Sequence, residues 1–168
     1  ELALPKLVRA LEKSLDLATV PNLTYVDESG SIVRNAIGPK LTADELADFP
    51  VPDYSHLPAG QYAGLSMASS RGCGFDCSFC STVYRKTYRA FEPSVFVDRL
   101  ELVMEHVRRT KLGVIQVIDD EFALKWRRAM EIIHELARRD MALELIYDCR
   151  ANELVKDGFV PTIAPVPQ

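Results

Sequence analysis

Hydrophobic positions in the first part of the chain follow helical spacing and then give way to two short β-prone runs. Apolar residues recur every three or four positions from residue 2 to about residue 17, which predicts an amphipathic helix with one core-facing side. That side consists of Leu4, Leu7, Val8, Leu11 and Leu15. Residues 23–26 and 31–34 flank a turn that ends in Gly30, so we expect a small hairpin. Residues 35–60 are interrupted by prolines and predict an irregular linker.

After residue 60, strand-like and helix-like stretches alternate. Strands are expected within residues 62–70, 113–118 and 143–147, and the second is a β-branched run typical of a strand covered on both faces. Three helices are expected. The first begins at Pro93, which suits the first position of a helix, and the others span residues 124–139 and 152–157. The expected buried stripe of the second helix is Trp126, Ala129, Met130, Ile133, Leu136 and Ala137. This order predicts an α/β fold with a parallel sheet and right-handed crossovers.

The composition narrows the class of protein. With 48% hydrophobic residues among 168, the chain can build a core of about one domain and is not intrinsically disordered. No apolar run approaches the ~20 residues of a membrane-spanning helix, and no signal peptide opens the chain, so we expect a soluble, cytoplasmic protein. The first residue is Glu1 and the last nine residues hold three prolines, so we expect a piece of a longer protein.

Charge argues against nucleic-acid and membrane partners. The formal net charge is −4, and no block of Lys and Arg is present to provide a broad positive surface. Basic and aromatic side chains do alternate in one short stretch: Tyr84, Arg85, Lys86, Tyr88 and Arg89. A single short loop is a small footprint for a nucleic acid, so we do not expect one to bind there.

Polar residues gather where the expected strands end. The first strand leads into residues 69–81, the second into Asp119-Asp120-Glu121, and the third into Asp148-Cys149-Arg150. Active sites of parallel sheets lie beyond the carboxyl ends of the strands. These three places are therefore the candidate functional site.

Three of the four cysteines, Cys73, Cys77 and Cys80, lie within eight residues at C-x3-C-x2-C spacing. In a reducing compartment such a cluster indicates metal binding or chemistry rather than disulfides. Zinc and an iron–sulfur cluster both suit three thiolates. A closed zinc site needs a fourth ligand, and the three histidines lie at no finger-like spacing, whereas a cubane with three thiolates leaves one iron open for another ligand. Cys149 is either a distant fourth ligand or, as we expect, a buried inert thiol.

The chain resembles the radical S-adenosylmethionine (SAM) enzymes in its cysteine spacing and in Phe79, which stands just before the last cysteine. The expected strand before the loop and the helix after it also agree with that family. Residues 117–122, 148–150 and the linker text at 46–54 are similar to the subgroup whose barrel follows a cobalamin-binding domain. The resemblance implies a partial (β/α) barrel, of which about three of six βα units are present. It also implies three parts, namely the end of an upstream cobalamin-binding-like domain (1–34), a linker (35–60) and the first part of the barrel (61–168).

The resemblance further implies cofactors. Cys73, Cys77 and Cys80 would ligate a [4Fe–4S] cluster, and the amino and carboxylate groups of SAM would bind the open iron. Reduction would then cleave SAM to methionine and a 5′-deoxyadenosyl radical. Cobalamin would belong to the upstream domain, although no Asp-x-His-x-x-Gly sequence is present to provide a lower ligand to cobalt.

Five further residues acquire roles from the resemblance. Asp119, Asp120 and Glu121 would accept hydrogen bonds from the SAM ammonium, since carboxylates bind cations by charge-assisted hydrogen bonds. Arg150 would pair with the SAM carboxylate, and Phe79 would lie near the adenine. Other readings stay open: a core aromatic for Phe79, an acidic helix N-terminus for Glu121, and a surface salt bridge for Arg150.

The reaction class implied is methyl transfer or a related carbon–carbon or ring-forming step on a small-molecule or peptide substrate. A reducing partner such as a flavodoxin or ferredoxin would supply the electron. Two other hypotheses remain. One is a zinc-stabilised structural or interaction module, and the other is a truncated remnant that keeps the motif without activity.

Overall fold

The computed structural model describes residues 2–82 and 84–156, and the chain divides into two compact units, residues 1–41 and 42–168. The first unit contains helix α1 (Ala3–Glu12), a 3-10 turn (Leu17–Thr19) and strands β1 (Thr24–Val26) and β2 (Ile32–Arg34). The two strands pair antiparallel, which confirms the expected hairpin. The side chain of Asp27 accepts backbone hydrogen bonds from Ser29 and Ser31, both 2.9 Å long, and so closes the turn.

Helix α1 differs from its expectation in length and in burial. It ends at Glu12 rather than near residue 17. Its apolar side is not core-facing, because Leu4 is 67% exposed and Leu11 62% exposed, and Ala10 is its one buried residue within the described part. The periodicity therefore predicted the helix correctly, but the expected burial of that side was wrong.

Residues 42–60, expected as an irregular linker, begin with a short helix, α2 (Ala43–Ala47). Thr42 and Glu45 form a reciprocal capping box, with the Thr42 N–H donating to Glu45 Oε2 at 2.8 Å and the Glu45 N–H donating to Thr42 Oγ1 at 3.2 Å. Arg99 of helix α3 (Pro93–Arg108) donates to the carbonyl oxygens of Ala47, Phe49 and Pro50 at the other end of α2. Within the second unit, these bonds hold residues 47–50 against α3.

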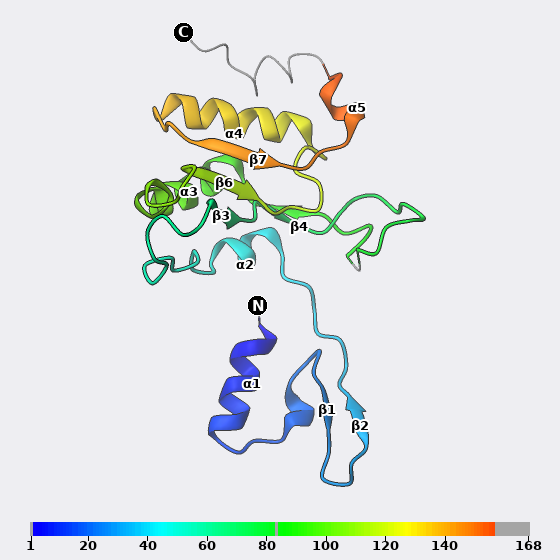
Figure 1. The fold of residues 1–168 in the computed structure, drawn as a ribbon. Helices are drawn as coiled ribbons and strands as arrows, with labels where there is room; N and C mark the ends of the chain where they lie inside the picture. Colours follow the sequence, from blue (N-terminus) through cyan, green and yellow to red (C-terminus); the bar gives the residue numbers. More distant parts are fainter. Residues whose placement is uncertain (1, 83, 157–168) are drawn as a thin grey trace. The chain divides into compact units, whose positions relative to one another are not determined.

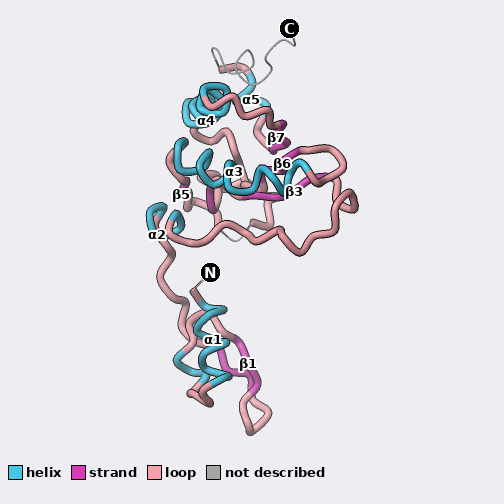
Figure 2. The backbone as a smooth tube through the Cα atoms, turned by 90° about the vertical axis from the view of Figure 1, so that its left-hand side faces the viewer, coloured by secondary structure: helices cyan, strands magenta, loops and turns pink. Residues whose placement is uncertain are grey.

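The second unit is built on a parallel three-stranded sheet in the order β3 (Gly64–Met67), β6 (Val114–Val117), β7 (Glu144–Tyr147) (Figure 1). Helices α3 (Pro93–Arg108) and α4 (Trp126–Arg138) connect successive strands and pack against each other, and a short helix, α5 (Ala151–Leu154), follows β7 (Figure 2). The expected alternation of strands and helices is thus confirmed. Residues 157 and 158, at the expected end of the last helix, lie outside the described residues.

The core lies between the sheet and the two long helices. Its fully buried members come from α3, β6, the residues after β6 and α4, and they include Phe96, Val97, Leu100, Ile115, Phe122 and Ile132. On β3 burial alternates, since Leu65 and Met67 are buried while Ser66 is exposed, whereas on β6 Gln116 is the one exposed residue. The buried side of α4 is rotated from its expectation and consists of Arg128, Ala129, Ile132 and Leu136. Among the described residues, no helix has the length and apolar character needed to cross a membrane.

Candidate functional site

The cysteines lie in a long loop that is closed at its base. Two-residue strands β4 (Ser70–Arg71) and β5 (Arg89–Ala90) pair antiparallel, and the Phe91 N–H donates to the Ser69 carbonyl at 3.0 Å. We call residues 69–71 and 89–91 the neck, and residues 72–88 the cysteine loop. The neck follows directly from β3, so the loop leaves the sheet at the carboxyl ends of its strands.

Gly72 makes the first turn of the cysteine loop possible. Its φ of +78° lies in the left-handed region, and a Cβ built on it would lie 1.8 Å from the carbonyl oxygen of Thr87. Beside it, the Thr87 N–H donates to the Cys73 carbonyl at 3.1 Å, and the Cys73 N–H donates to the Tyr84 carbonyl at 3.2 Å. The two sides of the loop therefore approach so closely here that only glycine fits.

All three loop cysteines are free thiols of intermediate exposure. Two of their sulfur atoms accept backbone hydrogen bonds, Cys73 Sγ from Phe75 at 3.5 Å and Cys80 Sγ from Thr82 at 3.4 Å. Hydrogen bonding by Thr82 lowers the pKa of the Cys80 thiol. The three sulfur atoms share one short loop, but no three His, Cys, Asp or Glu side chains in the described part of the chain are gathered as ligands of a metal ion.

Cys149, after β7, is in a different setting. It is half-buried, and burial raises the pKa of its thiol, with further contributions from the carboxylates of Glu121 and Glu153. The thiol is therefore protonated at neutral pH, but it is only half-buried rather than buried as the sequence predicted.

Asp119 is buried at the exit of β6 and is fully engaged by the neck. Its Oδ1 accepts the backbone N–H groups of Ser69 (2.7 Å) and Ser70 (2.9 Å), and its Oδ2 accepts their two hydroxyl groups (2.5 and 2.7 Å). The side chain is 6% exposed. The structure thus gives Asp119 a role in holding the neck, which the sequence analysis did not predict.

The exits of β6 and β7 reach the cysteine loop through Asp120 and Arg150. The hydroxyl of Thr82 donates to Asp120 Oδ1 at 3.4 Å, and the guanidinium of Arg150 lies 4.0 Å from the ring centroid of Phe75. Because Phe75 and Thr82 lie on either side of the last two cysteines, both strand exits contact the loop that carries the motif. The structure therefore brings together the three polar segments selected from the sequence.

Glu121 is buried rather than presented at the surface. It is 4% exposed, its Oε1 accepts the Arg150 N–H at 3.3 Å, and burial raises the pKa of its carboxyl group. The alternative reading of Glu121 as an acidic helix N-terminus is wrong, because α4 begins at Trp126 and has no acidic residue in its first turn. Glu153 of α5 is equally buried and also contributes to raising the pKa of Glu121.

Phe79 and residues 84–86 of the basic stretch are at the surface, whereas Tyr88 and Arg89 are half-buried. Phe79 is 91% exposed, so the alternative reading of a core aromatic is wrong. Lys86 and Arg85 pair with Asp76 of the same loop at 2.6 and 3.3 Å, which neutralises part of the local positive charge.

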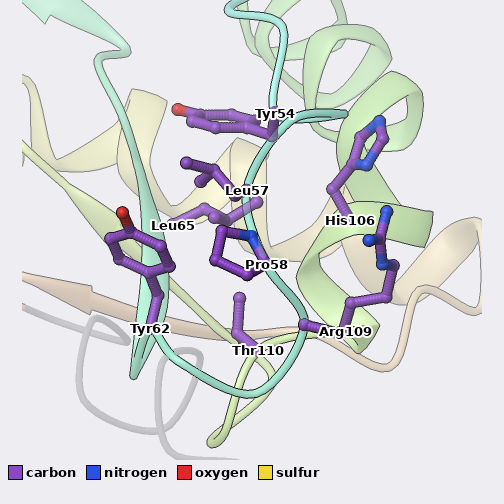
Figure 3. A pocket seen from close by; sticks show the side chains of 9 residues that line it. Tyr54, Leu57, Pro58, Tyr62, Leu65, His106, Arg109 and Thr110 are labelled. Atoms are coloured by element: carbon purple, nitrogen blue, oxygen red, sulfur yellow. The ribbon is translucent and has the colours of Figure 1, made fainter.

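A small pocket elsewhere in this unit can be set aside. It has a volume of about 10 Å³ and is lined by residues of the segment before β3 and of the last turn of α3, including Tyr54, Pro58, His106 and Arg109 (Figure 3). Tyr62, which precedes β3, also lines it, so the pocket lies at the amino ends of the strands. A cavity of this size accommodates about one water molecule and no substrate.

Known proteins were compared with the chain in sequence and in fold. No protein-family model matches. A methyltransferase of uncharacterised activity from Pyrococcus horikoshii is 29% identical over 162 residues, which are 90% of this chain and 33% of that protein. The solved structure of OxsB, a cobalamin-dependent SAM radical enzyme with aqua-cobalamin and SAM bound, aligns over 94% of this chain with a TM-score of 0.72 and 22% identity. The chain therefore shares the fold of one part of OxsB.

A second solved relative agrees. The radical SAM methyltransferase TsrM from Kitasatospora setae, with cobalamin and a [4Fe–4S] cluster bound, aligns over 83% of this chain with a TM-score of 0.60 and 20% identity. These comparisons confirm the resemblance stated from the cysteine motif. The chain spans about a third of the Pyrococcus relative and 23% of OxsB, so it corresponds to one part of such an enzyme.

Proposed function

We propose that this chain forms the cluster- and SAM-binding part of a radical SAM enzyme. Cys73, Cys77 and Cys80 would hold a [4Fe–4S] cluster, which when bound supplies the electron for reductive cleavage of SAM. The donor set fits this group, because three free thiols share one loop and two of them accept backbone N–H groups that stabilise thiolate charge. The observation that carries the proposal is the contact of the β6 and β7 exits with this loop.

The groups around the loop suit the three parts of SAM. Asp120 is exposed beside Thr82 and would accept hydrogen bonds from the ammonium group. Arg150, also exposed, presents a planar fork that matches the carboxylate. Phe79 offers an exposed ring face on which the adenine would stack.

The buried acids after β6 would support these contacts rather than make them. Asp119 already accepts four hydrogen bonds from the neck, and Glu121 binds the backbone N–H of Arg150. Glu121 would therefore orient Arg150, and Asp119 would orient the loop. Of the three acids that the resemblance would place at the ammonium group, Asp120 alone takes that role in this proposal.

The remaining parts of the proposal concern the whole protein. The three-stranded sheet would be the first part of a six-stranded partial barrel, and residues 1–34 the end of an upstream domain that holds cobalamin. The activity would be methyl transfer or a related radical step on a small molecule, in the cytoplasm, with a flavodoxin or ferredoxin as reductant. The Pyrococcus relative and TsrM are both methyltransferases, which supports methyl transfer.

The test is anaerobic reconstitution of the chain with iron and sulfide, followed by electron paramagnetic resonance (EPR) of the reduced protein with and without SAM. We expect about four irons per chain and a signal that changes when SAM is added. Cys77→Ala should lose the cluster, and the matched control Cys149→Ala should keep it. Binding of zinc alone, or equal iron content in the two variants, would overturn the proposal and favour a structural module.

A further inference from the structure

Arg128 of α4 ties together the two sides of the neck. Its Nε donates to the Phe91 carbonyl at 2.8 Å, while one terminal nitrogen donates to the Ser69 carbonyl at 2.8 Å and the other to Ser69 Oγ at 3.2 Å. Ser69 precedes the cysteine loop and Phe91 follows it. A single guanidinium therefore binds the chain on both sides of the loop, in addition to the β4–β5 pairing.

Arg128 and Asp119 are joined through Ser69. The Ser69 hydroxyl accepts from Arg128 and donates to Asp119 Oδ2, so the cation of α4 and the carboxylate after β6 act on the same residue. Arg128 is 7% exposed, Asp119 6% and Ser69 0%. Burial of two charged groups is costly unless their hydrogen-bonding atoms are satisfied, and here most of those bonds are made to the neck.

We propose that Arg128 and Asp119 are positioning residues that clamp the neck and thereby fix the cysteine loop beside Asp120 and Arg150. The hydrogen bonds of both side chains are made to Ser69, Ser70 and Phe91, so both act on the cysteine loop through the neck. The geometry of Arg128 is specific, because its donors diverge to a carbonyl on each side of the neck and a lysine ammonium lacks this planar fork. The effect on SAM rests on the proposed function, whereas the effect on loop opening does not.

The first test measures opening of the loop in the metal-free chain. Arg85 and Lys86 are exposed tryptic sites inside the cysteine loop, and their cleavage reports how often the neck opens. We expect Arg128→Lys to raise cleavage at these sites about tenfold, normalised to cleavage at Lys40 outside this unit. The matched control is Arg127→Lys on the neighbouring exposed position of α4, which should cleave as the wild type does.

Two further variants keep the inference open to refutation. Ser70→Ala removes one hydrogen bond from Asp119 and should raise cleavage in the same direction by a smaller factor. The double variant Asp119→Asn/Arg128→Lys should raise cleavage by less than the product of the two single factors, because both groups are coupled through Ser69, and a full product would overturn the coupling. Wild-type cleavage in folded Arg128→Lys would overturn the inference. If circular dichroism shows that Arg128→Lys does not fold, wild-type cleavage in Ser70→Ala would overturn it.

The second test separates this inference from the proposed function. In reconstituted Arg128→Lys we expect the cluster to form but the SAM-dependent change of the EPR signal to be lost, while Arg127→Lys keeps it. Absence of any cluster in the wild type would refute the proposed function and leave the cleavage result standing. A wild-type response to SAM in Arg128→Lys would refute the positioning role.

Discussion

Replacing Gly72 by alanine tests the close approach at the start of the cysteine loop. Any L-residue at its φ of +78° costs roughly 1–2 kcal/mol. The new Cβ would also lie 1.8 Å from the Thr87 carbonyl oxygen, so the two sides of the loop must separate. Separation breaks the Thr87–Cys73 and Cys73–Tyr84 backbone hydrogen bonds, each worth about 0.5–1.5 kcal/mol. We therefore expect a total destabilisation of about 2–5 kcal/mol, limited by the free energy of opening the neck.

Gly113 provides the matched control in the same unit. Its φ is +66°, but a Cβ there meets nothing within 4 Å, so Gly113→Ala carries the conformational cost alone. Urea unfolding followed by circular dichroism gives both free energies, and trypsin cleavage at Lys86 reports opening of the loop. The reasoning is wrong if Gly72→Ala is no more destabilising than Gly113→Ala and leaves cleavage at Lys86 unchanged.

Three further changes test other parts of the second unit. Hydrogen bonds from Arg138 and Arg139 lower the pKa of Glu135 from its usual 4.5 to about 2, so their stabilisation is complete above pH 4.5 and disappears as pH falls towards 2. The difference in melting temperature between wild type and Glu135→Gln should follow that course; a constant difference would contradict it. Phe122 is fully buried, with its ring centroid 4.6 Å from that of Tyr147. Phe122→Ala should lower the free energy of unfolding in urea by about 3–5 kcal/mol, and a decrease below about 1 kcal/mol would refute its place in the core. Phe79→Ser should change the unfolding free energy by no more than about 0.5 kcal/mol yet weaken the SAM-dependent EPR change, and an unaltered SAM titration would remove Phe79 from the proposed site.

Periodicity predicted the elements of the second unit well, because α3 and α4 each bury one side and the three strands of the parallel sheet lie within the expected ranges. Periodicity failed to predict burial where burial depends on which other elements pack against a helix. The apolar side of α1 has the right spacing for a core helix, yet Leu4 and Leu11 are exposed. Helix α2 was not predicted, because prolines surround it in the sequence. Thr42 and Glu45 lie at capping-box spacing, and this signal could have predicted the start of the helix.

The candidate site was predictable at the level of segments but not of single contacts. Parallel strands direct their carboxyl ends to one edge of a sheet, and this rule predicted that Asp120 and Arg150 lie near the cysteine loop. In the structure both residues contact that loop. The burial of Arg128 was not predicted, because an arginine within a helix is normally exposed. The apolar periodicity of α4 also gave no indication that a charged residue next to Ala129 is buried. Partners such as Ser69 and Phe91 lie 59 and 37 residues away, and no local pattern encodes them.

The long sequence separation of the clamp has a consequence for the order of biosynthesis. Asp119 emerges 50 residues after Ser69, and Arg128 59 residues after it. At about 5–20 residues per second, the three loop cysteines are made several seconds before the side chains that close the neck. During translation the thiols therefore pass through an interval in a loop that is not yet clamped. In that interval the three cysteine thiols would be more accessible to metal insertion or oxidation than they are in the folded protein.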